Sequence, residues 1–263
     1  MYITNSSTGN TIGGDRVAGE GNLISGNGTS GVLIEDSSSN TVSGNHIGID
    51  INGTAALGNP IGVALITGAD NNTVGGTTTG ERNVISGNLI WGIFLDNSDG
   101  NDIQGNYVGT DSGGTSPLPN TIYGIYLTND ADNSTIGGTT AGHRNTISYN
   151  GIDGVLIEDS SDNNTIQGND IENNGFSGVM VDDSVSNTIT RNSIYNNGDL
   201  GIELIFGGNN EYPSPVFSST AYEITNGTVR VEGPAPANSE VEIFYTGPNP
   251  DPSGSGEGLT YLT

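Results

Sequence analysis

The chain has 263 residues, and its 30 acidic residues outnumber five basic ones, all of them arginine, so that the formal net charge is −25 at pH 7. This charge excludes nucleic-acid binding, because no basic stripe is present to neutralise phosphates. No apolar run approaches the roughly 18 residues of a membrane span. The absence of cysteine excludes disulfides and thiolate metal sites. We therefore expect an acidic protein of the cell surface or extracellular space, without membrane insertion.

The sequence repeats itself on two scales. The segment Asn72-Thr-Val-Gly-Gly-Thr-Thr-Thr-Gly-Glu-Arg-Asn83 returns about sixty residues later as Asn133-Ser-Thr-Ile-Gly-Gly-Thr-Thr-Ala-Gly-His-Arg-Asn145. A shorter motif, Asn-Thr-Val/Ile, recurs near residues 10, 40, 72, 101, 133, 164 and 187. Periods of roughly 20–50 residues are typical of solenoid proteins, in which stacked repeats share one core.

Each repeat predicts three short strands in chain order. The first begins with a glycine followed by alternating apolar residues, as at Gly31, Gly92 and Gly154. The second is Asn-Thr-Ile/Val, and the third is Asn-x-Ile/Val, as at Asn45 and Asn106. Such β-branched triplets between glycines make poor helices, so a helical solenoid is rejected. The pattern predicts an all-β parallel β-helix of about seven coils over residues 1–208.

Strand alternation indicates which side chains fill the bore of this helix. Val32 and Ile34, or Ile93 and Leu95, point inward and stack on their equivalents in the other coils. One asparagine of each repeat occupies the same corner, where the amides can hydrogen-bond as a ladder. We assign this corner to Asn40, Asn72, Asn101, Asn133, Asn164 and Asn187.

The outward position of the first strand is unusual, because a solvated face should be polar there. It is occupied in successive repeats by Leu33, Ala64, Phe94, Tyr126, Leu156, Met180 and Glu203. Trp91 and Tyr123 lie beside this stripe. Three interpretations stay open: loops or the C-terminal segment cover the stripe, a protein partner binds it, or sugars stack on its aromatic rings.

Acidic residues recur at the corner that follows the first strand, for example Glu35-Asp36 and Glu158-Asp159. Stacked carboxylates repel one another, so they need solvent, raised pKa values or a bound cation. Asp50 and Asp111 occupy equivalent positions in two long loops and are the candidate ligands for Ca²⁺, whose usual partners are such oxygens. No Asp-x-Asp-x-Asp-Gly loop is present.

The repeat pattern stops near residue 208. Residues 209–263 contain alternating strands separated by proline and glycine, which predicts a small antiparallel β-sandwich-like module. At the other end, Tyr2 and Ile3 look like half of a first strand. Two ends without caps suggest head-to-tail contact between subunits. The alternative is that the chain is a fragment of a longer protein.

These motifs resemble the right-handed parallel β-helix repeat proteins found in secreted bacterial surface proteins, with a following immunoglobulin-like module. The resemblance is carried by stretches such as Asn72-Thr-Val-Gly-Gly and Asn106-Tyr-Val-Gly-Thr-Asp111, and it implies the fold more than a function. Such helices include lyases, epimerases, adhesins and structural proteins. The Asp-Pro-His motif of the related epimerases is absent, since neither His46 nor His143 follows a proline.

From the residues we expect no enzymatic activity. Lysine is absent, and few arginines are available to hold an acidic polysaccharide. The expected function is that of a non-catalytic protein that self-associates through Leu33, Phe94, Tyr126, Leu156, Met180, Tyr2 and Ile3. The alternatives are an adhesin that binds carbohydrate through stacking on Trp91 and Tyr123, and a polysaccharide lyase or hydrolase.

Overall fold

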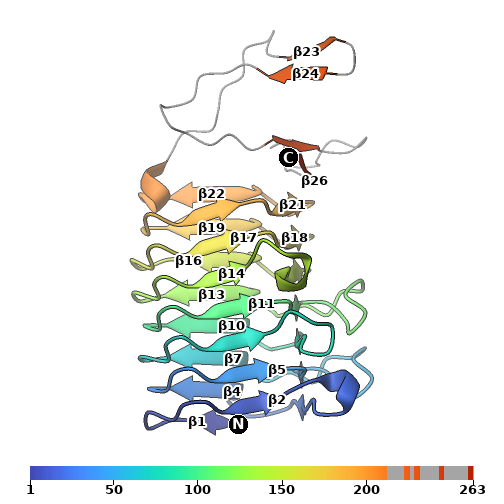
Figure 1. Ribbon diagram of the computed structural model, residues 1–263, viewed down its shortest axis with the longest axis vertical. Coiled ribbons are helices and arrows are strands. Elements are labelled where there is room, and N and C mark those ends of the chain that lie inside the picture. The colour runs from blue at the N-terminus through green and yellow to red at the C-terminus, as the bar shows by residue number, and fades with distance from the viewer. Residues whose placement is uncertain (212–221, 226–227, 232–242, 246–259, 263) are drawn as a thin grey trace.

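The computed structural model describes residues 1–211, 222–225, 228–231, 243–245 and 260–262. Within these residues, successive coils stack into a rod whose wall is made of three parallel sheets (Figure 1). Sheet A takes the first strand of each repeat and has eight strands, whereas sheets B and C take the second and third strands and have seven each. The expected all-β parallel β-helix is therefore confirmed.

The strands of the rod are short. Sheet A contains β1 (Tyr2–Ile3), β4 (Ser30–Glu35), β7 (Ile61–Ile66), β10 (Trp91–Asp96), β13 (Ile125–Thr128), β16 (Val155–Ile157), β19 (Val179–Asp182) and β22 (Ile202–Ile205). Sheet B contains β2 (Thr11–Gly13), β5 (Thr41–Ser43), β8 (Thr73–Gly75), β11 (Asp102–Gln104), β14 (Thr135–Gly137), β17 (Thr165–Gln167) and β20 (Thr188–Thr190). Sheet C contains β3 (Leu23–Ile24), β6 (His46–Ile47), β9 (Val84–Ile85), β12 (Tyr107–Val108), β15 (Thr146–Ser148), β18 (Asp170–Glu172) and β21 (Ser193–Tyr195).

The bore is filled by stacked β-branched and leucine side chains. Val32 and Ile34 of β4, and Ile93 and Leu95 of β10, are completely buried, as the alternation of the sequence predicts. Sheets B and C add one apolar column each, for example Ile103 and Ile147. These columns form one continuous hydrophobic core, which no single coil could bury by itself.

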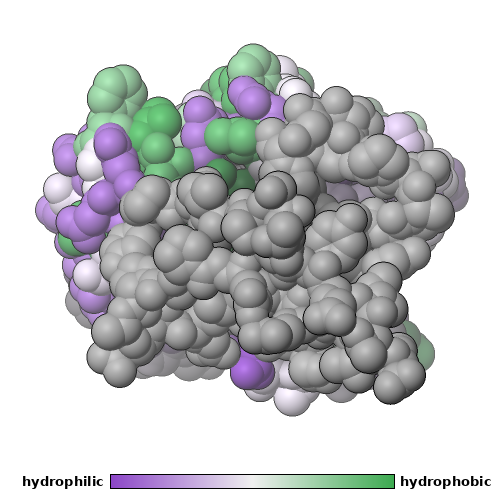
Figure 2. All heavy atoms as spheres, turned by 90° about the horizontal axis from the view of Figure 1, so that it is seen from above, coloured by the Kyte–Doolittle hydropathy of each residue, from purple (hydrophilic) through white to green (hydrophobic). Residues whose placement is uncertain are grey.

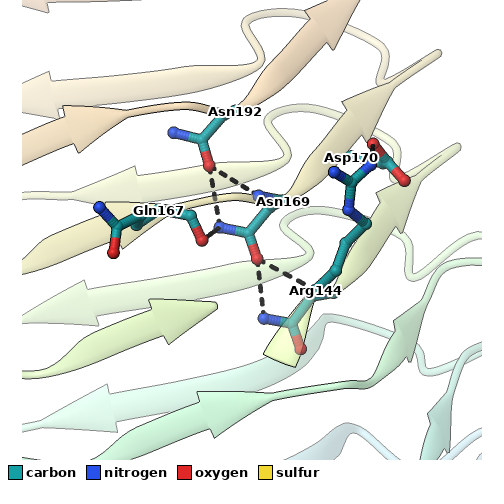
Figure 3. Close-up of polar contacts among 6 residues, drawn as sticks. Arg144, Gln167, Asn169, Asp170 and Asn192 are labelled. Carbon is teal, nitrogen blue, oxygen red and sulfur yellow. Dashed lines mark hydrogen bonds and ion pairs between the residues drawn. The ribbon is translucent and has the colours of Figure 1, made fainter. Parts of the chain in front are cut away.

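Three asparagine ladders, rather than one, hold the corners of the coil. In the ladder between sheets B and C, the backbone and side-chain N–H groups of Asn145 donate to Oδ1 of Asn169, and those of Asn169 donate to Oδ1 of Asn192 (Figure 3). A second ladder between sheets C and A runs from Asn27 to Asn197. Each buried amide thus satisfies backbone groups that the corners would otherwise leave unpaired.

The ladder between sheets A and B departs from the sequence assignment at one position. Ser134, not Asn133, takes the place between Asn101 and Asn164, because the N–H of Asn101 donates to Oγ of Ser134 and the N–H of Ser134 donates to Oδ1 of Asn164. Asn133 lies outside the ladder and is exposed, with φ of 57°. The assignment was wrong by one residue, because this repeat reads Asn-Ser-Thr instead of Asn-Thr.

Protruding loops leave the rod at two corners. One kind follows sheet B, and includes the short 3₁₀ helices η1 (Arg16–Ala18) and η2 (Ala141–His143). It starts at a glycine such as Gly75, whose φ is 100° and where an added Cβ would lie 1.8 Å from the carbonyl oxygen of Gln104. The other kind follows sheet C and is closed by antiparallel bridges, Ile49 with Ala56 and Thr110 with Pro117.

Beyond the rod, η3 (Gly208–Glu211) follows β22, and four further strands pair in two antiparallel ribbons. β23 (Tyr222–Thr225) pairs with β24 (Thr228–Val231), and β25 (Ile243–Tyr245) pairs with β26 (Thr260–Leu262). Most of the β-sandwich-like module expected over 209–263 lies outside the described residues. In a view along the rod, hydrophilic and hydrophobic residues are mixed around the visible rim (Figure 2).

Candidate functional site on the outer face of sheet A

The outward side chains of sheet A stand in register from coil to coil. The central column contains Tyr2, Leu33, Ala64, Phe94, Tyr126, Leu156, Met180 and Glu203. Parallel pairing places each of these residues directly beside the next, at the inter-strand spacing of about 4.8 Å. The structure therefore brings together the apolar stripe that the sequence indicates.

The members of the stripe differ in exposure. Leu33, Phe94, Tyr126 and Met180 are half-buried, whereas Leu156 is only 3% exposed. Tyr2 is exposed at the first strand of the sheet, but Ile3 belongs to the core of the rod and pairs with Ile34. Ile3 therefore presents no side chain to the outer face, because alternation turns it into the bore.

Four aromatic side chains form one cluster at the middle of this face. The ring centroids of Trp91 and Phe94 are 4.4 Å apart, and those of Trp91 and Tyr126 are 5.0 Å apart. Tyr126 also lies 5.3 Å from Phe94 and 5.3 Å from Tyr123. The indole N–H of Trp91 is buried and has no hydrogen-bond partner. The cluster presents partly exposed ring surface, while the indole N–H lies beneath it.

A second outward column lies beside the first, at the residue before the glycine of each strand of sheet A. The N–H of Gly92 donates to the carbonyl oxygen of Tyr123, and the N–H of Gly124 donates to that of Asp153. The same pattern joins Gly154 to Ser177. Successive coils therefore stack Trp91, Tyr123, Asp153 and Ser177 in line.

Two carboxyl groups, those of Glu158 and Asp153, adjoin the aromatic cluster, and a third, that of Glu203, lies further along the same face beside Met180. Glu158 accepts a hydrogen bond from the hydroxyl of Tyr126. Asp153, which is 2% exposed, accepts at Oδ1 from the backbone N–H of Ser177 at 2.8 Å. The hydroxyl of Ser177 donates to Oε2 of Glu203 at 2.7 Å. Ser177 thus links two carboxyl groups from coils on either side of its own.

The environment shifts the pKa values of these groups. Burial, reinforced by the charges of Glu203 and Asp199, raises the pKa of Asp153 to about 6, although the hydrogen bond from Ser177 opposes the shift. Burial and the hydrogen bond to Glu158 raise the pKa of Tyr126, and burial likewise raises the pKa of Tyr123. The site therefore combines two protonated phenols with a carboxyl group that still carries a proton in mildly acidic solution.

Sequence reasoning missed Asp153 and Ser177. It identified the acidic corner that contains Glu158, and it singled out Trp91 and Tyr123, but it did not follow their position before the strand glycine into the next coils. Aligning the repeats on that glycine would have placed Trp91, Tyr123, Asp153 and Ser177 in one column. The raised pKa of Asp153 leaves no sequence signal, because it depends on the coils stacked on either side.

Asp50 and Asp111, the candidate calcium ligands, lie elsewhere, in the loops after sheet C. Oδ1 of Asp50 accepts from the N–H groups of Thr54 and Ala55. Oδ1 of Asp111 accepts from those of Thr115 and Ser116. Among the described residues, no group of three or more side chains suited to a metal ion occurs. One oxygen of each aspartate is thus engaged by its own loop, and calcium binding stays a prediction.

The two columns and the coil that carries them define a β-helix protein with an aromatic and acidic outer face. A family model described as right handed beta helix region matches residues 62–228. This match covers more than half of the chain, and the protein belongs to that family. No curated protein was found to be similar in sequence. Within the described residues, no helix is long and apolar enough to cross a membrane.

Among solved structures, the chain is similar to the periplasmic alginate epimerase AlgG, with a TM-score of 0.52 and 19% identity, over 69% of this chain and 42% of that one. It is also similar to the A-module of the Azotobacter vinelandii mannuronan C-5 epimerase AlgE6, with a TM-score of 0.36 and 18% identity, over 77% of this chain and 63% of that one. The chain thus spans less than half of the AlgG chain. The likeness to AlgG shows the fold.

The expectations of a non-catalytic, self-associating protein and of no enzymatic activity are corrected by these comparisons. AlgG, the solved structure whose fold this chain shares, is an epimerase and not a structural or filament-forming protein. The expectation of no enzymatic activity rested on the scarcity of basic residues and on the missing Asp-Pro-His motif, and neither excludes catalysis by carboxyl groups.

Proposed function

We propose that the protein is an enzyme that binds a polysaccharide along the outer face of sheet A and modifies it there. The observation that carries the proposal is the cluster of Trp91, Phe94, Tyr123 and Tyr126 beside Asp153. Sugar rings present C–H faces that pack on aromatic rings, and their hydroxyl groups hydrogen-bond to carboxylates. The similarity in fold to an alginate epimerase supports a carbohydrate substrate without naming it.

The reaction that these groups support best is hydrolysis of a glycosidic bond. Such hydrolysis uses two carboxyl groups, one that donates a proton and one that activates water. Asp153, with a pKa near 6, gives its proton to the glycosidic oxygen as the bond from that oxygen to the anomeric carbon breaks. Because Asp153 is 2% exposed, this step requires the side chains that cover it to turn aside when the glycan binds. Glu203, linked to Asp153 through Ser177, takes the proton of the water that attacks the anomeric carbon.

We place the protein outside the cytoplasm as part of this proposal. Polysaccharides of cell walls and matrices occur there, and the solved structure of AlgG is that of a periplasmic enzyme. The strongly acidic composition suits a well-hydrated protein in such a compartment.

Binding is tested by affinity electrophoresis of purified protein in gels that contain defined polysaccharides. We expect Phe94→Ala to weaken retention on the order of tenfold, which corresponds to about 1.4 kcal/mol. Leu33→Ala serves as the matched control, because Leu33 is half-buried in the same column but belongs to no aromatic pair. Equal retention of wild type and Phe94→Ala on every polysaccharide would show that the aromatic cluster does not contribute to binding.

Catalysis is tested by the release of reducing ends from the polysaccharide that is retained. Asp153→Asn keeps an oxygen that can accept from Ser177 but has no proton to donate, so we expect retention to persist and release to fall by roughly 10²–10⁴-fold. In the wild type, release should decline as the pH rises through about 6, because Asp153 then loses its proton. If a polysaccharide retains the wild-type protein but no reducing ends are released from it, the protein binds the glycan without hydrolysing it.

A further inference from the structure

The outer face of sheet A also indicates the class of polysaccharide that it takes. We infer that the bound glycan is uncharged, and that carboxylates around the aromatic cluster select against uronate polymers. This inference rests on the proposed function, since it names the substrate of the same site. It departs from the alginate named for the structurally similar enzyme AlgG.

Each charged group that acts on the ionisable side chains of the cluster is an acid. The charges of Asp153 and Glu158 act on Tyr123, and those of Glu158 and Asp159 act on Tyr126. On Asp153 itself, the acting charges are those of Glu203 and Asp199.

Two more acids border the same face, at the outward ends of its strands. Asp96 ends β10, beside Thr128 of the next coil, and Asp182 ends β19. Both are partly exposed. The aromatic rings are therefore surrounded by negative charge in the described part of the chain.

The described arginines lie at a different place, the corner between sheets B and C. Arg16 contacts Nδ1 of His46 at 3.0 Å. The guanidinium of Arg82 lies 4.1 Å from the ring centre of Tyr107, and Arg144 pairs with Asp170 at 2.6 Å (Figure 3). Each of these three arginines reaches a residue that points outward from sheet C in the next coil.

The fourth arginine of the rod, Arg191, occupies the position equivalent to Arg82 and Arg144, two residues before the outward residue of a strand of sheet C. Arg16, Arg82 and Arg144 therefore join neighbouring coils at that corner. The charges that act on Tyr123, Tyr126 and Asp153 are all those of acids.

This separation of charge has opposite consequences for the two classes of glycan. A uronate polymer brings a carboxylate on each sugar ring to a face where no described cation offsets it, so binding adds repulsion and desolvation. A neutral sugar brings hydroxyl donors instead. Carboxylates such as Glu158 and Asp96 are strong acceptors for these hydroxyls, because hydrogen bonds to charged acceptors are the stronger ones.

The test compares retention on neutral polymers, galactomannan and xyloglucan, with retention on alginate and polygalacturonate. It uses affinity electrophoresis of the full chain at low and high salt. The variants are wild type, Phe94→Ala, Leu33→Ala and the double variant Asp96→Asn/Glu158→Gln, and circular dichroism melts show that each is folded. We expect the wild type and Leu33→Ala to be retained by at least one neutral polymer, and Phe94→Ala to lose this retention on the order of tenfold.

The double variant tests whether the negative charges of Asp96 and Glu158 cause the selection against uronates. Removing two negative charges should raise retention on uronates, most clearly at low salt, where electrostatic repulsion is least screened. If the wild type prefers uronates and Phe94→Ala loses that preference, the site is correct and the inference about charge is wrong. If neither class is retained by the wild type, the proposed function fails and the inference fails with it.

Discussion

At the scale of single residues, the fold depends on buried amides that bridge coils. Asn106 shows the arrangement: its backbone N–H donates to Oδ1 of Asn145, and its side-chain amide donates both to that Oδ1 and to the carbonyl oxygen of Val74. One side chain thus connects three coils. Because a buried polar group without a partner costs about 1–3 kcal/mol, these positions tolerate few other residues.

The ladder between sheets A and B contains one incomplete contact. Ser134 is too short to bond the side-chain amide of Asn101, whose Nδ2 is buried without a partner. Ser134→Asn should supply the missing acceptor and raise the free energy of unfolding by about 1 kcal/mol. Thermal unfolding followed by circular dichroism measures this change.

The matched control for this prediction is Ser134→Ala. It removes the hydroxyl that accepts from the N–H of Asn101 and should lower the melting temperature. A melting temperature of Ser134→Asn at or below that of the wild type would show that the corner has no room for the longer side chain.

The sequence identifies the asparagine-rich motif of each ladder, but it does not always show which residue of the motif takes the ladder position. The motif Asn-Thr-Ile places most amides correctly, because the threonine that follows begins a strand of sheet B. In the repeat with Asn133, Thr135 pairs with Asp102 and begins the strand of sheet B. The residue before it, Ser134, therefore takes the ladder position. Taking the residue directly before the first residue of the strand, rather than the asparagine of the motif, would have given Ser134.

At the scale of elements, the strands were predictable and the roles of the loops were not. The glycine-led and asparagine-led triplets match the strands of the three sheets because β-branched alternation and stacking act together at each coil. The loops after sheet C contain the equivalent residues Asp50 and Asp111, as predicted. Their backbone hydrogen bonds, however, depend on local turns that the spacing alone does not reveal.

Two variants of one loop distinguish a hydrogen-bonding role of Asp111 from a calcium-binding role. The hydrogen bonds from Thr115 and Ser116 lower the pKa of Asp111 although burial raises it, so the carboxylate is held in place by its own loop. We expect Asp111→Asn to melt within about 1 °C of the wild type and Asp111→Ala to melt several degrees lower. Differential scanning calorimetry measures both.

The same calorimetric scans with and without a chelator test calcium. If Asp50 and Asp111 only support their loops, chelator leaves the melting temperature of the wild type unchanged. A lower melting temperature in chelator, together with equal losses in Asp111→Asn and Asp111→Ala, would instead assign the carboxylates to a bound cation.

At the scale of the whole molecule, the function could not be predicted from composition. The net charge of −25 led to the expectations that the chain has no nucleic-acid partner and is not an enzyme, and the second of these was wrong. What composition does not show is the distribution of charge: arginines join coils at one corner, while acids surround the aromatic rings on another face. That distribution arises only when coils about thirty residues apart in sequence lie side by side.

The stacked acids make stability depend on ionic strength. The carboxylates of Asp99, Asp132 and Asp162 lie in three successive coils, and their mutual repulsion adds to burial in raising the pKa of Asp132. The distances between neighbours lie within the Debye length of about 10 Å at 0.1 M salt, so the repulsion acts on the folded rod and is relieved when the chain unfolds. Raising sodium chloride from about 0.05 to 0.5 M should therefore increase the melting temperature by several degrees, with chelator present to exclude divalent cations. Sucrose of equal osmolality is the control, because it stabilises proteins without screening charge. A melting temperature that rises equally in sucrose, or not at all in salt, would mean that solvent already neutralises the acidic columns.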